Sequence, residues 1–197
     1  MAGNKRAIIV GIPGVGKTTV ITRAAEILLS QKHKKVTIVT YGTLMFDEAQ
    51  KMGVKNRDEM RRLPVEQQKR LQESAAKRIA EMNDDVVIVD THLFISTGEG
   101  YYPGLPMRLL TIMNPTNLVM VAADPQEIAD RRKNDPTRLR DEAAPQAIKN
   151  DLDISKMMLA SCSILTGAPF AIVLNDNGKV DEAAAGIAKI LAGESPK

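Results

Sequence analysis

Residues 11–18 carry the clearest chemical signal in the chain, because Gly-Ile-Pro-Gly-Val-Gly-Lys-Thr matches the pattern G-x-x-x-x-G-K-[ST] in full. The glycines allow the backbone to turn tightly, so that successive N–H groups can point at one anion. The helix expected to open at Lys17 adds the positive end of its dipole at the same place. An apolar run at 7–10 predicts the buried strand that such a loop follows. The segment therefore predicts a site for the phosphates of a nucleoside triphosphate.

Each residue type in this loop has an expected role. Lys17 can reach the β- and γ-phosphates, which makes it the first candidate catalytic residue. The Thr18 hydroxyl can coordinate Mg²⁺. The residues expected to surround the phosphates are Gly11, Ile12, Pro13, Gly14, Val15, Gly16, Lys17, Thr18 and Thr19.

A second anchor is the apolar run 86–89, which ends in Asp90. If this run lies beside the first strand, Asp90 would be near Thr18 and would contact Mg²⁺ directly or through water. Alternatively, Asp90 only forms the turn that ends its strand. His92, two residues later, is either a contact for a substrate or a structural residue with satisfied hydrogen bonds.

Two arginine groups are candidates for binding phosphate, since the planar guanidinium can bind two phosphate oxygens at once. In the first group, Arg57 and Arg61 are four residues apart and would share a helical face. The second group is typical of a short flap that closes over phosphates. Its arginines are Arg131, Arg132, Arg138 and Arg140. Either group could instead be an ordinary charged surface, especially the first, which alternates with acidic residues.

Length and composition limit the class of protein. A chain of 197 residues with 44% hydrophobic residues suits one domain with a substantial core. The net charge of +3 suits anionic small substrates and is too small to indicate nucleic-acid binding. One cysteine excludes an internal disulfide and a zinc site built from cysteines. No apolar stretch is long enough to span a membrane and no signal peptide is evident, so we expect a soluble, cytoplasmic protein without a membrane partner.

Short β-branched runs alternate with longer helical stretches, which predicts a parallel sheet with helices on both faces. The expected strands are 7–10, 35–39, 86–89, 118–121 and 170–174. The expected helices are 17–31, 43–51, 65–83, 106–113, 125–134, 145–165 and 180–192. The stretches 96–106 and 135–141 are expected to be irregular, near the carboxyl ends of strands where α/β sheets bind ligands. The expected fold class is α/β, in three layers (αβα) around a five-stranded parallel sheet.

Six segments in order carry a family resemblance: Gly-Ile-Pro-Gly-Val-Gly-Lys-Thr, Tyr-Gly-Thr-Leu-Met-Phe, Arg-Asp-Glu-Met-Arg-Arg-Leu, Val-Asp-Thr-His, Gly-Tyr-Tyr-Pro-Gly-Leu-Pro and Leu-Thr-Gly-Ala. Together they resemble the archaeal-type adenylate kinases, which are P-loop nucleoside monophosphate (NMP) kinases. The phosphate loop alone is shared by many NTPases, whereas the combination of the segments at 41–46, 57–63 and 90–92 is much more specific. The resemblance covers nearly the whole chain.

This resemblance implies reversible phosphoryl transfer, ATP + AMP ⇌ 2 ADP, with Mg²⁺. It also implies one adenylate kinase domain over 1–197, whose parts are a core at 5–42, 84–134 and 145–193, a helical NMP-binding insert at about 43–72, and a short lid at about 135–141. Family members of this type form trimers, so a homotrimer is expected. The lid has no cysteine, so the zinc site of some longer adenylate kinases is not expected.

The resemblance also implies roles for individual residues. The residues that would bind AMP or border both nucleotides are Thr43, Arg57, Arg61, Asp90 and His92. Arg131 would join the phosphate-loop residues beside ATP. The residues that would act with Lys17 on the transferred phosphoryl group are Arg132, Arg138 and Arg140. The backbone at 175–180 would pass near the adenine of ATP.

Two other functions share parts of this pattern. A kinase for another small acceptor, such as CMP, UMP, GMP or shikimate, would keep the phosphate loop and change the acceptor pocket. A regulatory NTPase or a nucleic-acid motor would use ATP binding to drive a conformational change. The chain has no patch of interleaved aromatic and basic residues, so no nucleic-acid partner is expected.

Overall fold

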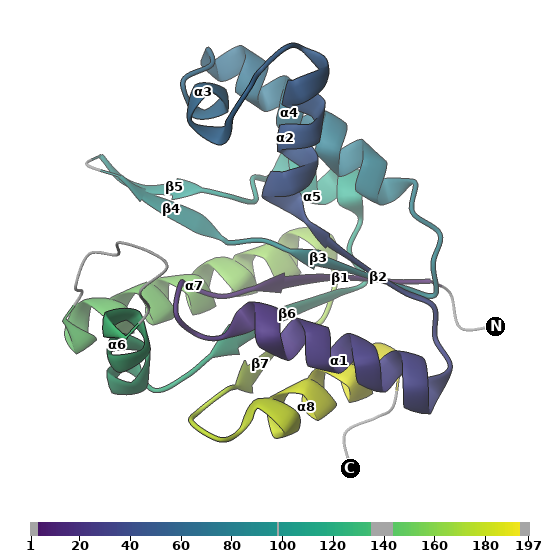
Figure 1. The fold of residues 1–197 in the computed structure, drawn as a ribbon, viewed down its shortest axis with the longest axis vertical. Helices are drawn as coiled ribbons and strands as arrows, with labels where there is room; N and C mark the ends of the chain where they lie inside the picture. Colours follow the sequence, from purple (N-terminus) through teal and green to yellow (C-terminus); the bar gives the residue numbers. More distant parts are fainter. Residues whose placement is uncertain (1–3, 98, 135–143, 194–197) are drawn as a thin grey trace.

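A parallel sheet of five strands forms the centre of the computed structural model, which describes residues 4–97, 99–134 and 144–193 (Figure 1). The strands lie in the order β2-β3-β1-β6-β7, so β1 is in the middle, between β3 and β6. Their bounds are β1 Lys5–Val10, β2 Val36–Thr40, β3 Val86–Asp90, β6 Asn117–Ala122 and β7 Phe170–Leu174. All five predicted strands are confirmed, with ends that differ by at most two residues.

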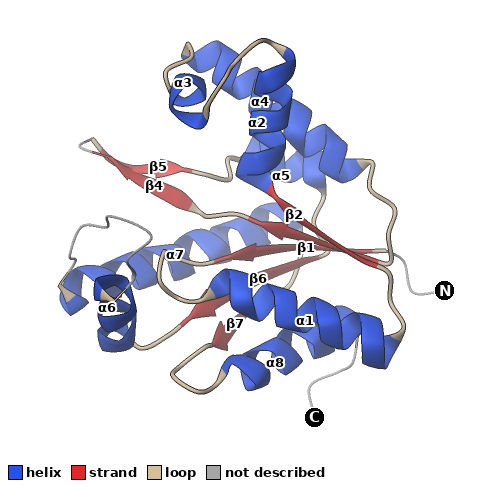
Figure 2. Ribbon diagram, in the orientation of Figure 1, coloured by secondary structure: helices blue, strands red, loops and turns tan. Residues whose placement is uncertain are grey.

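Helices cover both faces of the sheet, which confirms the predicted three layers (Figure 2). On one face α1 (Lys17–Lys32) and α8 (Val180–Ala192) pack side by side. On the other face lie α5 (Met107–Met113) and α7 (Pro145–Thr166). A further helix, α6 (Pro125–Lys133), follows β6 at the carboxyl edge of the sheet.

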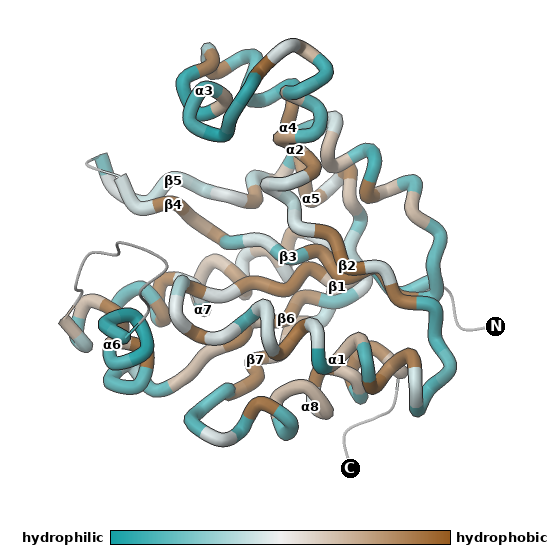
Figure 3. The backbone as a smooth tube through the Cα atoms, viewed as in Figure 1, coloured by the Kyte–Doolittle hydropathy of each residue, from teal (hydrophilic) through white to brown (hydrophobic). Residues whose placement is uncertain are grey.

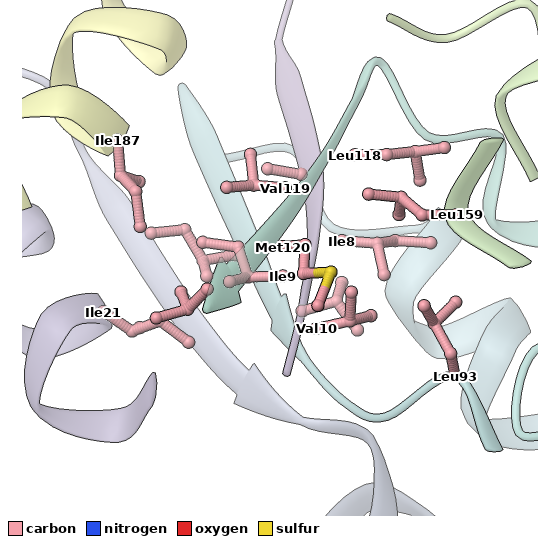
Figure 4. Packing of buried hydrophobic residues seen from close by; sticks show 14 of the residues in the cluster. Ile8, Ile9, Val10, Ile21, Leu93, Leu118, Val119, Met120, Leu159 and Ile187 are labelled. Carbon is pink, nitrogen blue, oxygen red and sulfur yellow. The ribbon is translucent and has the colours of Figure 1, made fainter. Parts of the chain in front are cut away.

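The main core is built from β-branched and aliphatic side chains that alternate between the two faces of the sheet. Ile9 and Val119 point towards Ile21 of α1 and Ile187 of α8, whereas Ile8 and Leu118 point towards Leu159 of α7 (Figure 4). The hydropathy of the chain follows the same plan, since the central strands of the five-stranded sheet are apolar while α3 and α6 are mostly hydrophilic (Figure 3). None of the helices in the described part of the chain combines the length and the apolar character needed to cross a membrane.

A separate helical unit stands above the sheet between β2 and β3 (Figure 1). It consists of α2 (Tyr41–Lys51), α3 (Arg57–Arg61) and α4 (Val65–Ala80). The unit has its own small core, formed by Ala49, Val54, Met60 and Leu71. The Tyr41 hydroxyl, at the start of α2, donates a hydrogen bond to the Gln72 carbonyl in the middle of α4 at 2.7 Å and so links the two helices. The sequence predicted α2 and α4, but it did not separate α3 as a helix.

The stretch expected to be irregular after β3 contains a β-hairpin, so that prediction was wrong for its first half. Strand β4 (Phe94–Thr97) pairs antiparallel with β5 (Gly100–Pro103). The rings of Phe94 and Tyr101 meet edge to face, with centroids 4.8 Å apart. This ring contact and the backbone pairing of β4 with β5 offset the destabilising effect of glycine and proline in the two strands.

At the end of the sheet where the parallel strands begin, Arg6 of β1 connects the carboxyl ends of two helices. Its guanidinium donates to the carbonyls of Met113 at 2.7 Å and Ala80 at 2.8 Å. Ala80 is the last residue of α4 and Met113 is the last residue of α5. The positive charge therefore satisfies carbonyls that have no partner within their own helices.

Candidate functional site

The phosphate-loop sequence forms the connection between β1 and α1, which confirms the predicted strand–loop–helix arrangement. Gly14 and Gly16 have φ angles of 93° and 78°, in the left-handed region that favours glycine. Gly16 directly precedes the first turn of α1, and Thr18 and Thr19 are exposed in that turn. Backbone N–H groups at the amino end of a helix, next to a loop of this shape, form an anion site.

Two residues from distant parts of the chain lie against this loop. The Arg132 Nε donates to the Pro13 carbonyl at 2.8 Å, and the Asn175 Nδ2 donates to the Val15 carbonyl at 2.7 Å. Sequence reasoning placed Arg132 near the phosphates through its charge, but it did not foresee this contact. The sequence indicated Asn175 only as part of the backbone at 175–180. The feature that could have pointed to its side chain is a polar residue directly after the last strand, where parallel sheets bind ligands.

Lys17 and Asp90 form an ion pair at the centre of the site. Asp90 is the last residue of β3 and lies beside Ile9 of β1, so the sheet itself delivers the carboxylate to the loop. The two side chains are only 17% and 12% exposed. Burial lowers the pKa of the Lys17 ammonium to about 8, although the adjacent carboxylate favours the charged form. The sequence predicted Asp90 near this loop, but not its pairing with Lys17.

His92 borders the same group of residues. Its pKa is lowered, first by partial removal from water and then by the positive charge of Lys17. Part of the residue is nevertheless exposed to solvent. Gly104 packs directly on it, because a Cβ at Gly104 would lie 2.5 Å from the His92 carbonyl oxygen. The lowered pKa favours the neutral imidazole of His92, and the chain that returns from the hairpin packs against its backbone.

A second polar group lies on the helical unit. The Arg57 Nη2 donates to the Thr43 hydroxyl at 3.0 Å, and the Arg57 guanidinium lies 5.8 Å from the centre of the Phe46 ring. The structure thus brings Arg57 and Thr43 together. Arg61 forms an ion pair with Asp58 at 2.8 Å on the exposed surface of α3. Arg57 and Arg61 therefore share a helix, while their guanidinium groups have different partners.

Arg131 contacts the turn after β7. Its Nη2 donates to the Asn175 carbonyl at 2.9 Å and to the Asn177 side chain at 2.8 Å, and it also pairs with Glu127 at 3.0 Å. The structure thereby ties α6 to the segment at 175–180. Arg138, Arg140 and the predicted lid at 135–141 lie outside the described residues.

Comparison with known proteins agrees with this architecture. A family model described as AAA domain matches residues 10–149. The adenylate kinase of Thermoplasma acidophilum is 45% identical over 188 residues, which cover 95% of this chain and 98% of that protein. The adenylate kinase of Methanocaldococcus jannaschii is 40% identical over 190 residues, with 95% and 98% covered.

Solved structures resemble the fold at much lower sequence identity. Shikimate kinase from Acinetobacter baumannii in complex with shikimate has a TM-score of 0.60 at 14% identity, and the match covers 98% of this chain and 96% of that one. Shikimate kinase from Bacteroides thetaiotaomicron has a TM-score of 0.59 at 14% identity, with 95% and 98% covered. At this identity the likeness establishes the fold.

Proposed function

This chain belongs to the adenylate kinase family, and we propose that it catalyses the reversible reaction ATP + AMP ⇌ 2 ADP at the site around Lys17 and Asp90. One observation carries the proposal. A complete phosphate loop faces one side of the site and a separate group of Arg57, Thr43 and Phe46 lies on the helical unit, in a chain 45% identical to an adenylate kinase along nearly its whole length.

The phosphate loop is the proposed site of the donor, ATP. Its cradle comprises residues 11–19, with Arg131 at its border. Lys17 forms an ion pair with Asp90 in the structure, so the ATP phosphates have to compete with this carboxylate for the ammonium. When the Lys17 ammonium moves from Asp90 to the phosphates, it places positive charge where negative charge develops during transfer.

The residues present also fit Mg²⁺, which prefers oxygen ligands. The Asp90 carboxylate and the Thr18 hydroxyl are the proposed ligands, and Asp90 becomes available once Lys17 has left it. When bound, Mg²⁺ would neutralise phosphate charge and orient the transferred group.

The helical unit is the proposed site of the acceptor, AMP. Arg57 and Thr43 already form a hydrogen-bonded pair, and Phe46 offers an aromatic face beside them. Arg61 would exchange Asp58 for the AMP phosphate, because an exposed ion pair is weak and easily replaced. His92, whose pKa is lowered by burial and by the charge of Lys17, would border both nucleotides.

Transfer between two phosphates needs no general base, since the acceptor oxygen is already anionic. The protein has to align the two nucleotides and exclude water, which would otherwise accept the phosphoryl group. We assign closure to the lid at 135–141 and its charge to Arg132, Arg138 and Arg140. The core at 5–42, 84–134 and 145–193 holds ATP, and the segment at about 43–72 holds AMP.

We also propose a cytoplasmic homotrimer. Strand β7 is an edge strand, and its outward side chains Phe170, Ile172 and Leu174 are exposed. Apolar side chains left in water at a sheet edge favour contact between copies of a chain. Light scattering of the purified protein would give the mass of three chains, and a monomer that does not change with concentration would contradict the trimer.

A coupled assay of ADP formation tests the function. With ATP as donor we expect AMP to be the preferred acceptor over CMP, UMP, GMP and shikimate. Lys17→Ala should lower kcat by more than about a hundredfold. Arg61→Ala should raise the KM for AMP far more than that for ATP, whereas Arg62→Ala, at the next exposed position, should change neither. Equal turnover of shikimate, or binding of only one nucleotide per chain, would contradict the proposal.

A further inference from the structure

The phosphate loop is held from outside by two side chains, each of which donates a hydrogen bond to a carbonyl that precedes a glycine. Asn175 Nδ2 is 2.7 Å from the Val15 oxygen, and Arg132 Nε is 2.8 Å from the Pro13 oxygen. Neither residue belongs to the loop, since Asn175 follows β7 and Arg132 lies in the last turn of α6.

These two bonds fix the direction of the N–H groups that follow. The C=O and the N–H of a trans peptide point in opposite directions, and every peptide bond in the described part of the chain is trans. With its carbonyl held by Asn175, the Val15–Gly16 peptide must turn the Gly16 N–H away from Asn175. By the same geometry, Arg132 turns the Gly14 N–H away from itself. Among the described residues neither N–H has a protein acceptor, so both donors are available to an anion.

The contacts leave little room for other arrangements. A Cβ at Gly16 would lie 2.5 Å from Asn175 Nδ2, and a Cβ at Gly14 would lie 3.0 Å from Arg132 Cγ. Asn175 itself is only 2% exposed, and its backbone N–H donates to the Ala122 carbonyl at 2.7 Å. Its side-chain oxygen has no partner in the described part of the chain, so a flipped amide would only place this oxygen against the Val15 carbonyl.

We propose that Asn175 and Arg132 are positioning residues that aim the N–H groups of Gly16 and Gly14 at the phosphates of the donor nucleotide. This inference rests on the proposed function, because it requires a phosphate at the loop. It explains why a buried asparagine follows the last strand, and it gives Arg132 a role through its Nε that is separate from its charge.

Two variants separate the two bonds. Asn175→Leu keeps the approximate size of the side chain and removes the donor without adding charge. Arg132→Lys keeps the positive charge and has no N–H at the position of Nε. Protein labelled with ¹⁵N-glycine has only 13 glycines, so the amide signals of Gly14 and Gly16 can be followed while ATP and Mg²⁺ are added.

In the unaltered protein, both signals should move downfield as the N–H groups bind phosphate. In Asn175→Leu the change at Gly16 should be lost while that at Gly14 remains, and in Arg132→Lys the reverse should hold. Each variant should weaken ATP binding by about tenfold and leave AMP binding unchanged. Asn150→Leu, which removes an exposed amide on α7, is the matched control and should behave like the unaltered protein.

The possible results have distinct meanings. If both signals respond normally in both variants, or if both are lost together in either one, the positioning role is refuted. If neither signal moves in the unaltered protein, the donor site is wrong and the proposed function fails with it. Should Asn175→Leu not fold, the response of Gly14 and Gly16 in Arg132→Lys decides the question.

Discussion

The buried Lys17 ammonium makes ATP binding sensitive to alkaline pH. Lys17 is 17% exposed, and burial lowers its pKa to about 8 in the protein without nucleotide. Phosphates beside the ammonium favour its charged form and should return the pKa towards the ordinary value of about 10.4. ATP therefore binds the protonated form, so its affinity is full below about pH 8 and falls as the pH rises towards the pKa of the complex.

The size of the effect follows from the two pKa values. Between about pH 7 and pH 9.5 the free protein loses its proton while the complex keeps it, which should weaken ATP binding roughly thirtyfold, or about 2 kcal/mol. The same pKa shift has the opposite effect on folding, because the free energy of unfolding should rise with pH while the ATP affinity falls. The unfolded chain holds the proton to about pH 10.4 and the folded chain releases it near pH 8, so this group should raise the free energy of unfolding by up to about 3 kcal/mol over that window.

Isothermal titration calorimetry of ATP with Mg²⁺, without AMP, measures the affinity for ATP and the number of protons taken up on binding. In buffers with different ionisation enthalpies, binding at about pH 8 should take up roughly half a proton. His92 does not titrate in this range, because its pKa is lowered from an ordinary value of about 6.5. Lys17→Arg is the matched control, since its guanidinium stays charged and its affinity should not depend on pH. An affinity that is constant from about pH 7.5 to 9.5, with no proton uptake, would refute this reasoning.

Three other predictions concern the surroundings of the site. Gly104→Ala should lower the free energy of unfolding in urea by about 1–3 kcal/mol, because its Cβ would meet the His92 carbonyl, whereas Gly186→Ala in α8 has room and should be neutral or stabilising. In steady-state kinetics, Arg57→Met should raise the KM for AMP by about tenfold to a hundredfold and that for ATP by less than about twofold, with Arg62→Met as the unaffected control. Arg6→Leu should lower the free energy of unfolding by about 2–4 kcal/mol, because helix-end carbonyls lose their donor, while kcat stays unchanged below the unfolding temperature.

Each of these has a clear contrary outcome. Equal stability of the two glycine variants would show that the backbone at Gly104 does not pack tightly against His92. Parallel changes in the KM values for AMP and ATP would place Arg57 outside the acceptor site. Loss of kcat without loss of stability in Arg6→Leu would mean that the amino edge of the sheet affects catalysis.

The sequence predicted the sheet and the loop well, because both are specified locally. Strands buried on both faces consist of continuous apolar runs, as at 86–89 and 118–121. The loop is specified by glycines and a lysine at fixed spacing. The hairpin at 94–103 was missed because its strands have four residues each and are mostly exposed, so that no apolar alternation marks them.

Contacts across long sequence separations could not be predicted in the same way. Asn175 and Val15 are 160 positions apart, and the partner of Asn175 depends on the placement of β7 within two strands of β1. For Arg132 the sequence indicated charge near phosphate, while the bond to Pro13 depends on how the last turn of α6 meets the loop. Asp90 was expected near Thr18, and in the structure its carboxylate pairs with Lys17, because both side chains are largely buried and a buried charge needs a partner of opposite charge.

The small core inside the helical unit has an evolutionary consequence. Ala49, Val54, Met60 and Leu71 pack among themselves, whereas Leu44, Ala75, Ala76 and Ile79 of α2 and α4 anchor the unit to the main core. Substitutions at the outer residues of the unit can then change which nucleobase the acceptor site recognises, while the ATP-binding half is preserved. Replacing residues 41–80 with those of a relative that uses another acceptor would therefore transfer the acceptor selectivity of that relative.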